Sequence, residues 1–206
     1  MTVMDNLREM IASKGTLHMA LIDPDKQPPE EAGRIAERML AAGSDAVLIG
    51  GSTGVTSENL AATTRAIKDA SGLPVIHFPG NAEALSSEVD ALFFMSMLNS
   101  TDLKWVIGAQ VFAAPYIRKL GIETIPMGYI IVEPGMMVGE VGKVKAIKHD
   151  EVDLAVAYAL ACEMLGMQLV YLEAGSGADR PVPPEMIRAV KKAISIPLIV
   201  GGGIRT

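Results

Sequence analysis

The stretch YLEAGSGA, residues 171–178, places a single glutamate where an apolar run gives way to small residues. At the end of a strand, in partly apolar surroundings, burial would raise the pKa of Glu173 and suit it to accept a proton near neutral pH. Tyr171 lies two residues earlier, so it would share one side of the strand with Glu173, and its hydroxyl could reach a bound polar ligand. The structural alternatives are an ion pair of Glu173 with Arg180 or Arg205, and a Tyr171 that bonds only to backbone.

A glycine triplet follows another apolar run, in GGGI at residues 201–204. Because glycine has no side chain, its backbone N–H group is accessible and can bind the oxygens of a phosphate. In barrel enzymes the loops after strands seven and eight commonly form such a site. A tight structural turn is the alternative, because such turns also use glycine. We favour phosphate binding for this triplet.

Two further strand ends carry candidate metal ligands. In LIDPDK, residues 21–26, Asp23 would lie closest to the strand, and Asp25 would more readily face solvent. Mg²⁺ prefers one or two carboxylates together with substrate phosphate oxygens, so Asp23 is a candidate ligand; a capped turn is the alternative. In GGSTGVT, residues 50–56, Ser52 could support a metal or a diphosphate, or merely cap the next helix. This segment lacks the lysine and the spacing of a P-loop.

Seven short apolar runs predict the strands that position these groups. The runs are continuous rather than alternating, as expected of strands buried on both faces of a parallel sheet. Helix-like segments stand between most of them, which indicates the α/β class. The expected strands are 17–22, 45–50, 74–78, 90–94, 123–132, 168–172 and 197–200, and the expected helices are 29–42, 56–70, 102–119, 150–166 and 183–193. The glycine-punctuated VEPGMMVGEVG, residues 132–142, is expected to be a long loop that acts as a lid or an interface.

Two architectures fit this alternation, a TIM-type (βα) barrel and an open doubly wound sheet. Polar or glycine-rich residues follow strand after strand, and in a barrel all these strand ends meet at one mouth. In an open sheet only the ends near the switch point would meet. We therefore expect one modified barrel domain over residues 1–206. A barrel needs eight strands and the sequence stops just after the seventh, so strand eight is expected to be missing at the C-terminus.

Composition limits the partners and the compartment. The formal net charge is −6, which disfavours nucleic acid because its phosphates need a positive surface. The single cysteine, Cys162, allows no internal disulfide and fits the reducing cytoplasm. Residues 1–15 are typical of an amphipathic helix rather than of a signal peptide, and no run reaches the roughly 18 apolar residues of a transmembrane segment.

The motifs LIDPDK, IGGSTGVT, YIIVEPG, YLEAGSGA and GGGI, in this order and spacing, resemble the geranylgeranylglyceryl phosphate synthase family, and its larger, mainly archaeal group in particular. The resemblance spans residues 17–204 and implies a modified TIM barrel. It implies an enzyme that moves a geranylgeranyl group from its diphosphate to the C3 hydroxyl of sn-glycerol 1-phosphate, the first ether-bond step of archaeal membrane lipid biosynthesis. It also implies a homo-oligomer, either a dimer or a hexamer.

The resemblance assigns roles to individual residues. Asp23 and Ser52 would hold Mg²⁺ on the diphosphate, and Glu173 would orient or deprotonate the attacking hydroxyl. Gly202 and Gly203 would bind the phosphate of glycerol phosphate. The rest of this substrate would be bound by Tyr171, Leu172, Glu173, Ala174, Gly175, Ser176 and Gly177.

Two other functions fit part of the pattern. A sugar-phosphate isomerase is also a phosphate-binding barrel, and it would use Asp23 and Glu173 as an acid and a base. A non-catalytic, glycerol-phosphate-sensing regulatory barrel would bind RNA as well. The acidic balance argues against RNA, and Asp23 and Ser52 would then have no obvious task.

Overall fold

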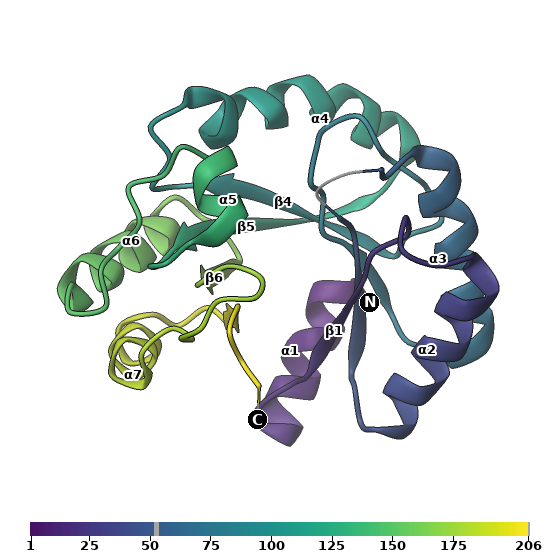
Figure 1. Cartoon of the computed structure of the whole chain (residues 1–206), viewed down its shortest axis with the longest axis horizontal. Coiled ribbons are helices and arrows are strands. Elements are labelled where there is room, and N and C mark those ends of the chain that lie inside the picture. The colour runs from purple at the N-terminus through teal and green to yellow at the C-terminus, as the bar shows by residue number, and fades with distance from the viewer. Residues whose placement is uncertain (52–53, 206) are drawn as a thin grey trace. The chain divides into compact units, whose positions relative to one another are not determined.

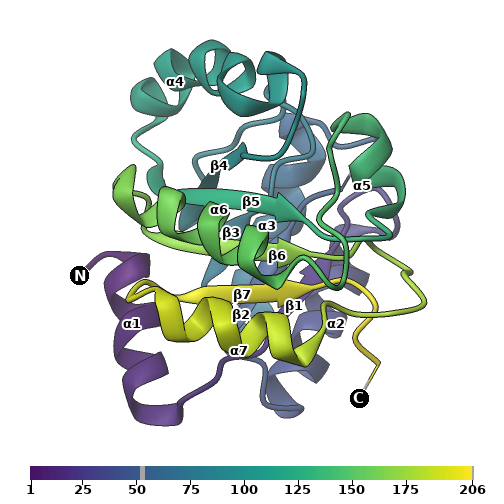
Figure 2. The ribbon, with the colours of Figure 1, turned by 90° about the vertical axis from the view of Figure 1, so that its left-hand side faces the viewer.

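The computed structural model describes residues 1–51 and 54–205, in which strands alternate with helices (Figures 1 and 2). The strands are β1 (Met19–Ile22), β2 (Ala46–Ile49), β3 (Val75–His77), β4 (Ala91–Met97), β5 (Glu123–Ile131), β6 (Leu169–Glu173) and β7 (Leu198–Gly201). The helices are α1 (Val3–Lys14), α2 (Pro29–Ala41), α3 (Ser57–Ser71), the π-helical turn η1 (Lys104–Gly108), α4 (Ala109–Leu120), α5 (Met136–Val141), α6 (Val152–Met164) and α7 (Pro184–Ala193). Every expected strand and helix is present, with ends that differ by a few residues. None of the helices in the described ranges is long and apolar enough to cross a bilayer.

The strands are hydrogen-bonded in the order in which they occur in the sequence, from β1 to β7. The β1–β2, β2–β3, β3–β4, β5–β6 and β6–β7 pairs are parallel. A doubly wound sheet would reverse its strand order at a switch point. No reversal occurs in the part of the chain that the structure describes, so the predicted barrel-type order is confirmed over the doubly wound alternative.

The chain forms two compact units, of which the first comprises Met1–Phe93 and Val111–Thr124. Its helices α2 and α3 lie side by side (Figure 1). Gly33 allows their close approach, because a Cβ at this position would lie 2.9 Å from the carbonyl oxygen of Ala66. The buried cluster that joins these helices to β1, β2 and β3 consists of Ile22, Ala32, Ala36, Val47, Ile49, Leu60, Ile67, Leu73, Val75 and Val89.

The second unit comprises Phe94–Gln110 and Ile125–Thr206. Helices α6 and α7 cover one face of β5, β6 and β7 (Figure 2). The buried cluster on this face includes Ile130, Val170 and Leu172 from the strands and Ala159, Cys162, Met186 and Val190 from the helices. Because side chains alternate along a strand, Tyr129, Tyr171 and Glu173 point to the opposite face. The polar residues of interest are therefore separated from the helix layer.

One segment differs from its expectation. Residues Met136–Val141 form the short helix α5, where the sequence predicted a continuous loop. Gly135 begins this helix with a left-handed φ of 74°, and the N–H of Gly139 donates to the Gly135 carbonyl at 2.9 Å. Glycine is a poor helix former. The three glycines at 135, 139 and 142 therefore concealed this helix in the sequence.

Candidate active site

Glu173 is the last residue of β6, and only 6% of its surface is exposed. Its Oε1 accepts a 2.6 Å hydrogen bond from the backbone N–H of Gly175. Burial raises the pKa of Glu173, while hydrogen bonds from Gly175, Tyr171 and Tyr129 act in the opposite direction. The predicted rise in pKa is thus confirmed in direction, and its cause is the loss of water around the carboxylate.

The ion-pair alternative for Glu173 is not found in the described part of the chain. Among residues 1–51 and 54–205, no lysine, arginine or histidine nitrogen lies within 4.0 Å of its carboxylate. Arg205 instead lies 3.9 Å from Asp179, and both of these side chains are largely exposed. The buried carboxylate is therefore held by hydrogen-bond donors without a salt bridge.

Two tyrosines surround the carboxylate. The Tyr171 hydroxyl hydrogen-bonds to Glu173, a partner that the sequence did not suggest. Tyr129 of β5 is the register partner of Tyr171, and its hydroxyl lies 3.5 Å from Oε2 of Glu173. The two rings meet edge to face, with centroids 5.2 Å apart. The sequence analysis did not identify Tyr129 as a residue of this site. The one sequence feature that pointed to it was its position at the start of the motif YIIVEPG.

The glycines that follow β6 and β7 pack against these side chains. A Cβ at Gly201 would collide with the ring and hydroxyl of Tyr171. A Cβ at Gly202 would collide with the Glu173 carboxylate and lie 2.5 Å from the Gly175 nitrogen. Gly202 also has a left-handed φ of 80°, which disfavours other residues. Packing thus brings Gly202 to Glu173 and Gly175, while phosphate binding by Gly202 and Gly203 stays a prediction.

The loop after Glu173 is held against the start of α5. The Gly135 N–H donates to the Ala174 carbonyl at 2.9 Å, and a Cβ at Gly175 would lie 2.7 Å from the Gly135 carbonyl oxygen. Ser176 and Gly177 at the tip of the loop are exposed. The side chains of Leu172 and Ala174 are fully buried in the helix-side cluster instead. These two side chains therefore pack on the other face, and a role of Leu172 and Ala174 in binding glycerol phosphate stays a prediction for their backbone atoms.

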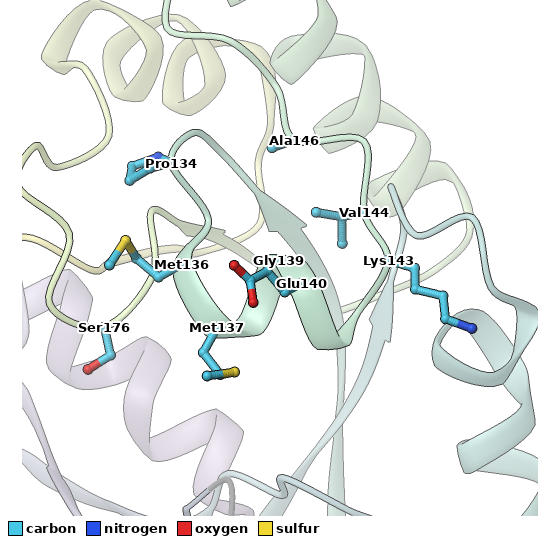
Figure 3. Close-up of a pocket in the computed structure, with 9 residues that line it drawn as sticks. All are labelled: Pro134, Met136, Met137, Gly139, Glu140, Lys143, Val144, Ala146 and Ser176. Carbon is cyan, nitrogen blue, oxygen red and sulfur yellow. The ribbon is translucent and has the colours of Figure 1, made fainter.

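A pocket of about 710 Å³ lies beside this loop in the second unit (Figure 3). It shares Ser176 with the predicted glycerol-phosphate loop. Its lining combines apolar residues with a few polar groups, a common composition for small-molecule pockets. The residues are Pro134, Met136, Met137, Gly139, Glu140, Lys143, Val144, Ala146 and Ser176.

Asp23 belongs to the first unit and directly follows β1. It is half-buried, and burial together with the charge of Asp25 raises the pKa of Asp23, against the opposite effect of Lys26. The Oδ1 atoms of Asp23 and Asp25 each lie 3.4 Å from the position that a Cβ would take at Gly51. Asp25 is thus turned toward the same glycine as Asp23, and its side chain is only 18% exposed. Counted with its backbone, Asp25 is exposed, as expected of a residue that faces solvent.

The second predicted metal ligand, Ser52, lies outside the described residues, so its role stays a prediction. Within residues 1–51 and 54–205, no three His, Cys, Asp or Glu side chains gather as a metal site. A cation held by Asp23 would therefore need further oxygen ligands, such as those of a diphosphate.

The sequence matches the PcrB family over residues 8–206. The chain belongs to the PcrB family. Among the relatives of this PcrB protein, the geranylgeranylglyceryl phosphate synthase of Thermococcus gammatolerans is 55% identical over 193 residues, which are 94% of this chain and 77% of the relative. The enzyme of the same name from Methanothermobacter marburgensis is 50% identical over 206 residues, or 100% of this chain and 83% of the relative. The predicted family resemblance is confirmed.

Solved structures share the fold of this PcrB protein. Wild-type GGGPS from Thermoplasma volcanium gives a TM-score of 0.94 at 44% identity, covering 100% of this chain and 82% of that one. The (S)-3-O-geranylgeranylglyceryl phosphate synthase of Thermoplasma acidophilum, in complex with its substrate sn-glycerol-1-phosphate, gives 0.95 at 46% identity and covers 100% and 83%. A tryptophan synthase from Mycobacterium tuberculosis, at 14% identity and a TM-score of 0.55, is similar in fold alone. The predicted TIM-type (βα) class is confirmed.

Proposed function

We propose that this PcrB protein transfers a geranylgeranyl group from geranylgeranyl diphosphate to the C3 hydroxyl of sn-glycerol 1-phosphate. The proposal is carried by the buried Glu173 carboxylate, which bonds to Gly175 and packs against Gly202 between two glycine-rich turns. A small substrate that carries both a phosphate and a hydroxyl suits this arrangement, with the phosphate on bared N–H groups and the hydroxyl at the carboxylate. The names of the relatives and the Thermoplasma acidophilum complex support the same substrates.

In the proposed reaction Glu173 accepts the proton of the C3 hydroxyl of glycerol phosphate. The oxygen of this hydroxyl attacks C1 of the prenyl donor. The ether C–O bond forms as the bond from C1 to the diphosphate breaks, and pyrophosphate leaves with the bonding electrons. Burial increases the basicity of the Glu173 carboxylate, because it raises the pKa. Hydrogen bonds from Gly175 and Tyr171 lower the pKa of Glu173 and so favour the ionised form that acts as a base.

Family membership favours this function over the two alternatives. A sugar-phosphate isomerase would need Asp23 and Glu173 as an acid/base pair on one substrate. In a regulatory barrel that senses glycerol phosphate, Asp23 would have no function. Neither alternative is supported by the names of the PcrB relatives.

We further propose that Mg²⁺ is the cofactor and that Asp23 and Ser52 hold it. The donor chemistry around Asp23 fits a hard cation, because the carboxylates of Asp23 and Asp25 converge beside Gly51. When bound, Mg²⁺ would neutralise the charge of the departing diphosphate. The chain itself carries a net charge of −6 and two anionic substrates must bind, so a cation and backbone N–H groups would add the positive potential that these substrates need.

We also propose that the enzyme is a cytoplasmic homo-oligomer. Helix α4 exposes Val111, Phe112, Tyr116 and Leu120 to between 40% and 66%. Their spacing puts them along one side of the helix, where a second copy of the chain would cover them. The single cysteine, Cys162, is free and buried, which fits a reducing compartment.

The function is tested by incubating the purified protein with radiolabelled geranylgeranyl diphosphate, Mg²⁺ and either sn-glycerol 1-phosphate or sn-glycerol 3-phosphate. We expect labelled prenyl ether with the 1-phosphate and little with its enantiomer. The Thermoplasma acidophilum enzyme serves as the positive control. The absence of labelled ether with both isomers, while the control is active, would contradict the proposal.

The metal assignment is checked in the same assay. Asp23→Asn should raise the Mg²⁺ concentration that gives half the maximal rate, because one charged ligand is lost. Superimposable Mg²⁺ titration curves for the variant and the wild type would show that Asp23 is not a ligand.

A further inference from the structure

We propose that Tyr129 is a positioning residue for Glu173, whose hydroxyl fixes Oε2 of the carboxylate so that the remaining lone pairs face the substrate hydroxyl. The inference rests on the proposed function, in which Glu173 accepts a proton from that hydroxyl. Tyr129 acts through Glu173 and does not itself contact the reacting atoms.

The pairing of β5 with β6 brings this tyrosine to the carboxylate. Tyr129 is opposite Tyr171 in the register, and Glu173 lies two residues beyond Tyr171 on the same face. The Tyr129 hydroxyl lies 3.5 Å from Oε2, which is longer than the roughly 2.5–3.0 Å of an ordinary O–H···O hydrogen bond. Catalytic hydrogen bonds are often long without substrate and shorten when it binds. The geometry therefore suits a contact that strengthens as the site fills.

The two carboxylate oxygens have different partners. Oε1 is tied to the glycine-rich loop by the 2.6 Å bond from the Gly175 N–H, whereas Oε2 faces Tyr129. Ile131, the β5 residue directly opposite Glu173, has no polar side-chain atom and cannot donate. The donor that β5 supplies to this carboxylate is therefore Tyr129. With the carboxylate buried, each donor matters because the charged form is otherwise disfavoured.

Tyr129 is buried against Tyr171 and stays protonated. Only 4% of the residue is exposed, and its ring meets that of Tyr171 at an interplanar angle of 72°. Burial and the neighbouring charge of Glu173 raise the pKa of Tyr129 well above its usual value. The hydroxyl thus keeps its proton and can donate a hydrogen bond to the carboxylate throughout the pH range in which Glu173 titrates.

The first test is Tyr129→Phe, which removes the hydroxyl and keeps the ring. With one donor lost, the pKa of Glu173 rises, so the acidic limb of the pH profile of kcat should move up by about 0.5 to 1 pH unit. At pH values below the midpoint of this limb, kcat should fall about three- to tenfold and recover as the pH is raised, while KM for glycerol phosphate changes little. Tyr158→Phe, a half-buried tyrosine on α6, is the matched control and should leave the profile unchanged. An unshifted profile for Tyr129→Phe would overturn the proposal.

A double variant separates positioning from general stabilisation. If Tyr129 acts through Glu173, then Tyr129→Phe should cause no further loss of kcat in a Glu173→Gln background. Losses that multiply in the double variant would instead show an independent structural role, and would count against the proposal.

A direct titration makes the inference independent of turnover. The chain is labelled with ¹³C at the glutamate side-chain carboxyl carbon, and the Glu173 signal is assigned by its absence in Glu173→Gln. Tyr129→Phe should raise the midpoint of that signal relative to the wild type, and an identical midpoint would refute the contact. If the wild type forms no prenyl ether, the proposed function fails, whereas this titration still decides whether Tyr129 controls the carboxylate.

Discussion

Gly201 and Gly202 are glycines because side chains from β6 occupy the space where a Cβ would stand. Tyr171 fills this space at Gly201, and the Glu173 carboxylate fills it at Gly202. In the sequence the triplet resembled a phosphate cradle or a tight turn, and both interpretations ignored the neighbouring strand. At this scale, the identity of a residue is set by contacts that only the folded chain reveals.

Gly201→Ala tests this packing. The added methyl group overlaps the Tyr171 ring and should lower the free energy of unfolding by about 1–3 kcal/mol. In a Tyr171→Ala background the cost should be much smaller, because the space is then open. Gly139→Ala is the control, since a Cβ there would make only ordinary contacts of 3.5 Å or more. Urea denaturation of the four variants measures the effect, and an equal cost in both backgrounds would contradict the packing argument.

Part of the site could be predicted from single residues. Glu173 was identified because a carboxylate that ends an apolar run must be buried at a strand end, and its raised pKa is confirmed in direction. Tyr129 could not be identified in this way, because its role depends on the register between β5 and β6, which lie some forty residues apart in the sequence.

The elements were predicted well where local signals agree and poorly where tertiary contacts decide. Continuous apolar runs predicted the strands, because β2, β3 and β6 are buried on both faces. The π-helical turn η1 lies within the helix expected over 102–119, and only its π-helical form was not predicted. Two of its carbonyls accept side-chain hydrogen bonds, from Ser96 to Val106 at 2.6 Å and from Gln110 to Trp105 at 3.4 Å. Helix α5 was missed, because its glycines favour a loop and the hydrogen bond from Gly135 to Ala174 is a tertiary contact.

The apolar side of α4 provides a prediction at the scale of an element. If a second copy covers Phe112 and Tyr116, then Phe112→Glu combined with Tyr116→Glu should lower the sedimenting mass toward that of a single chain. Lys119→Glu, an exposed residue of the same helix, is the control for the added negative charge. A wild-type protein that sediments as a monomer at micromolar concentration would contradict the proposed assembly.

At the scale of the whole molecule, the strand order was predictable because polar residues follow strand after strand. Functional groups at successive strand ends are useful together only if those ends share one rim, which favours the barrel over the doubly wound sheet. The sequential order from β1 to β7 and the structural match to Thermoplasma volcanium GGGPS confirm this interpretation. The positions of Ser52 and of any bound cation are not part of that confirmation, and the magnesium site stays a prediction.

The most direct test of the account is the turnover of Glu173→Gln, because Gln keeps the shape of the side chain and removes its basicity. We predict that kcat for prenyl transfer to sn-glycerol 1-phosphate falls about 10²- to 10⁴-fold, with an unchanged circular dichroism spectrum. Glu185→Gln, at an exposed position in the first turn of α7, should retain wild-type turnover. A Glu173→Gln variant that turns over as fast as the wild type would show that this carboxylate is not the base.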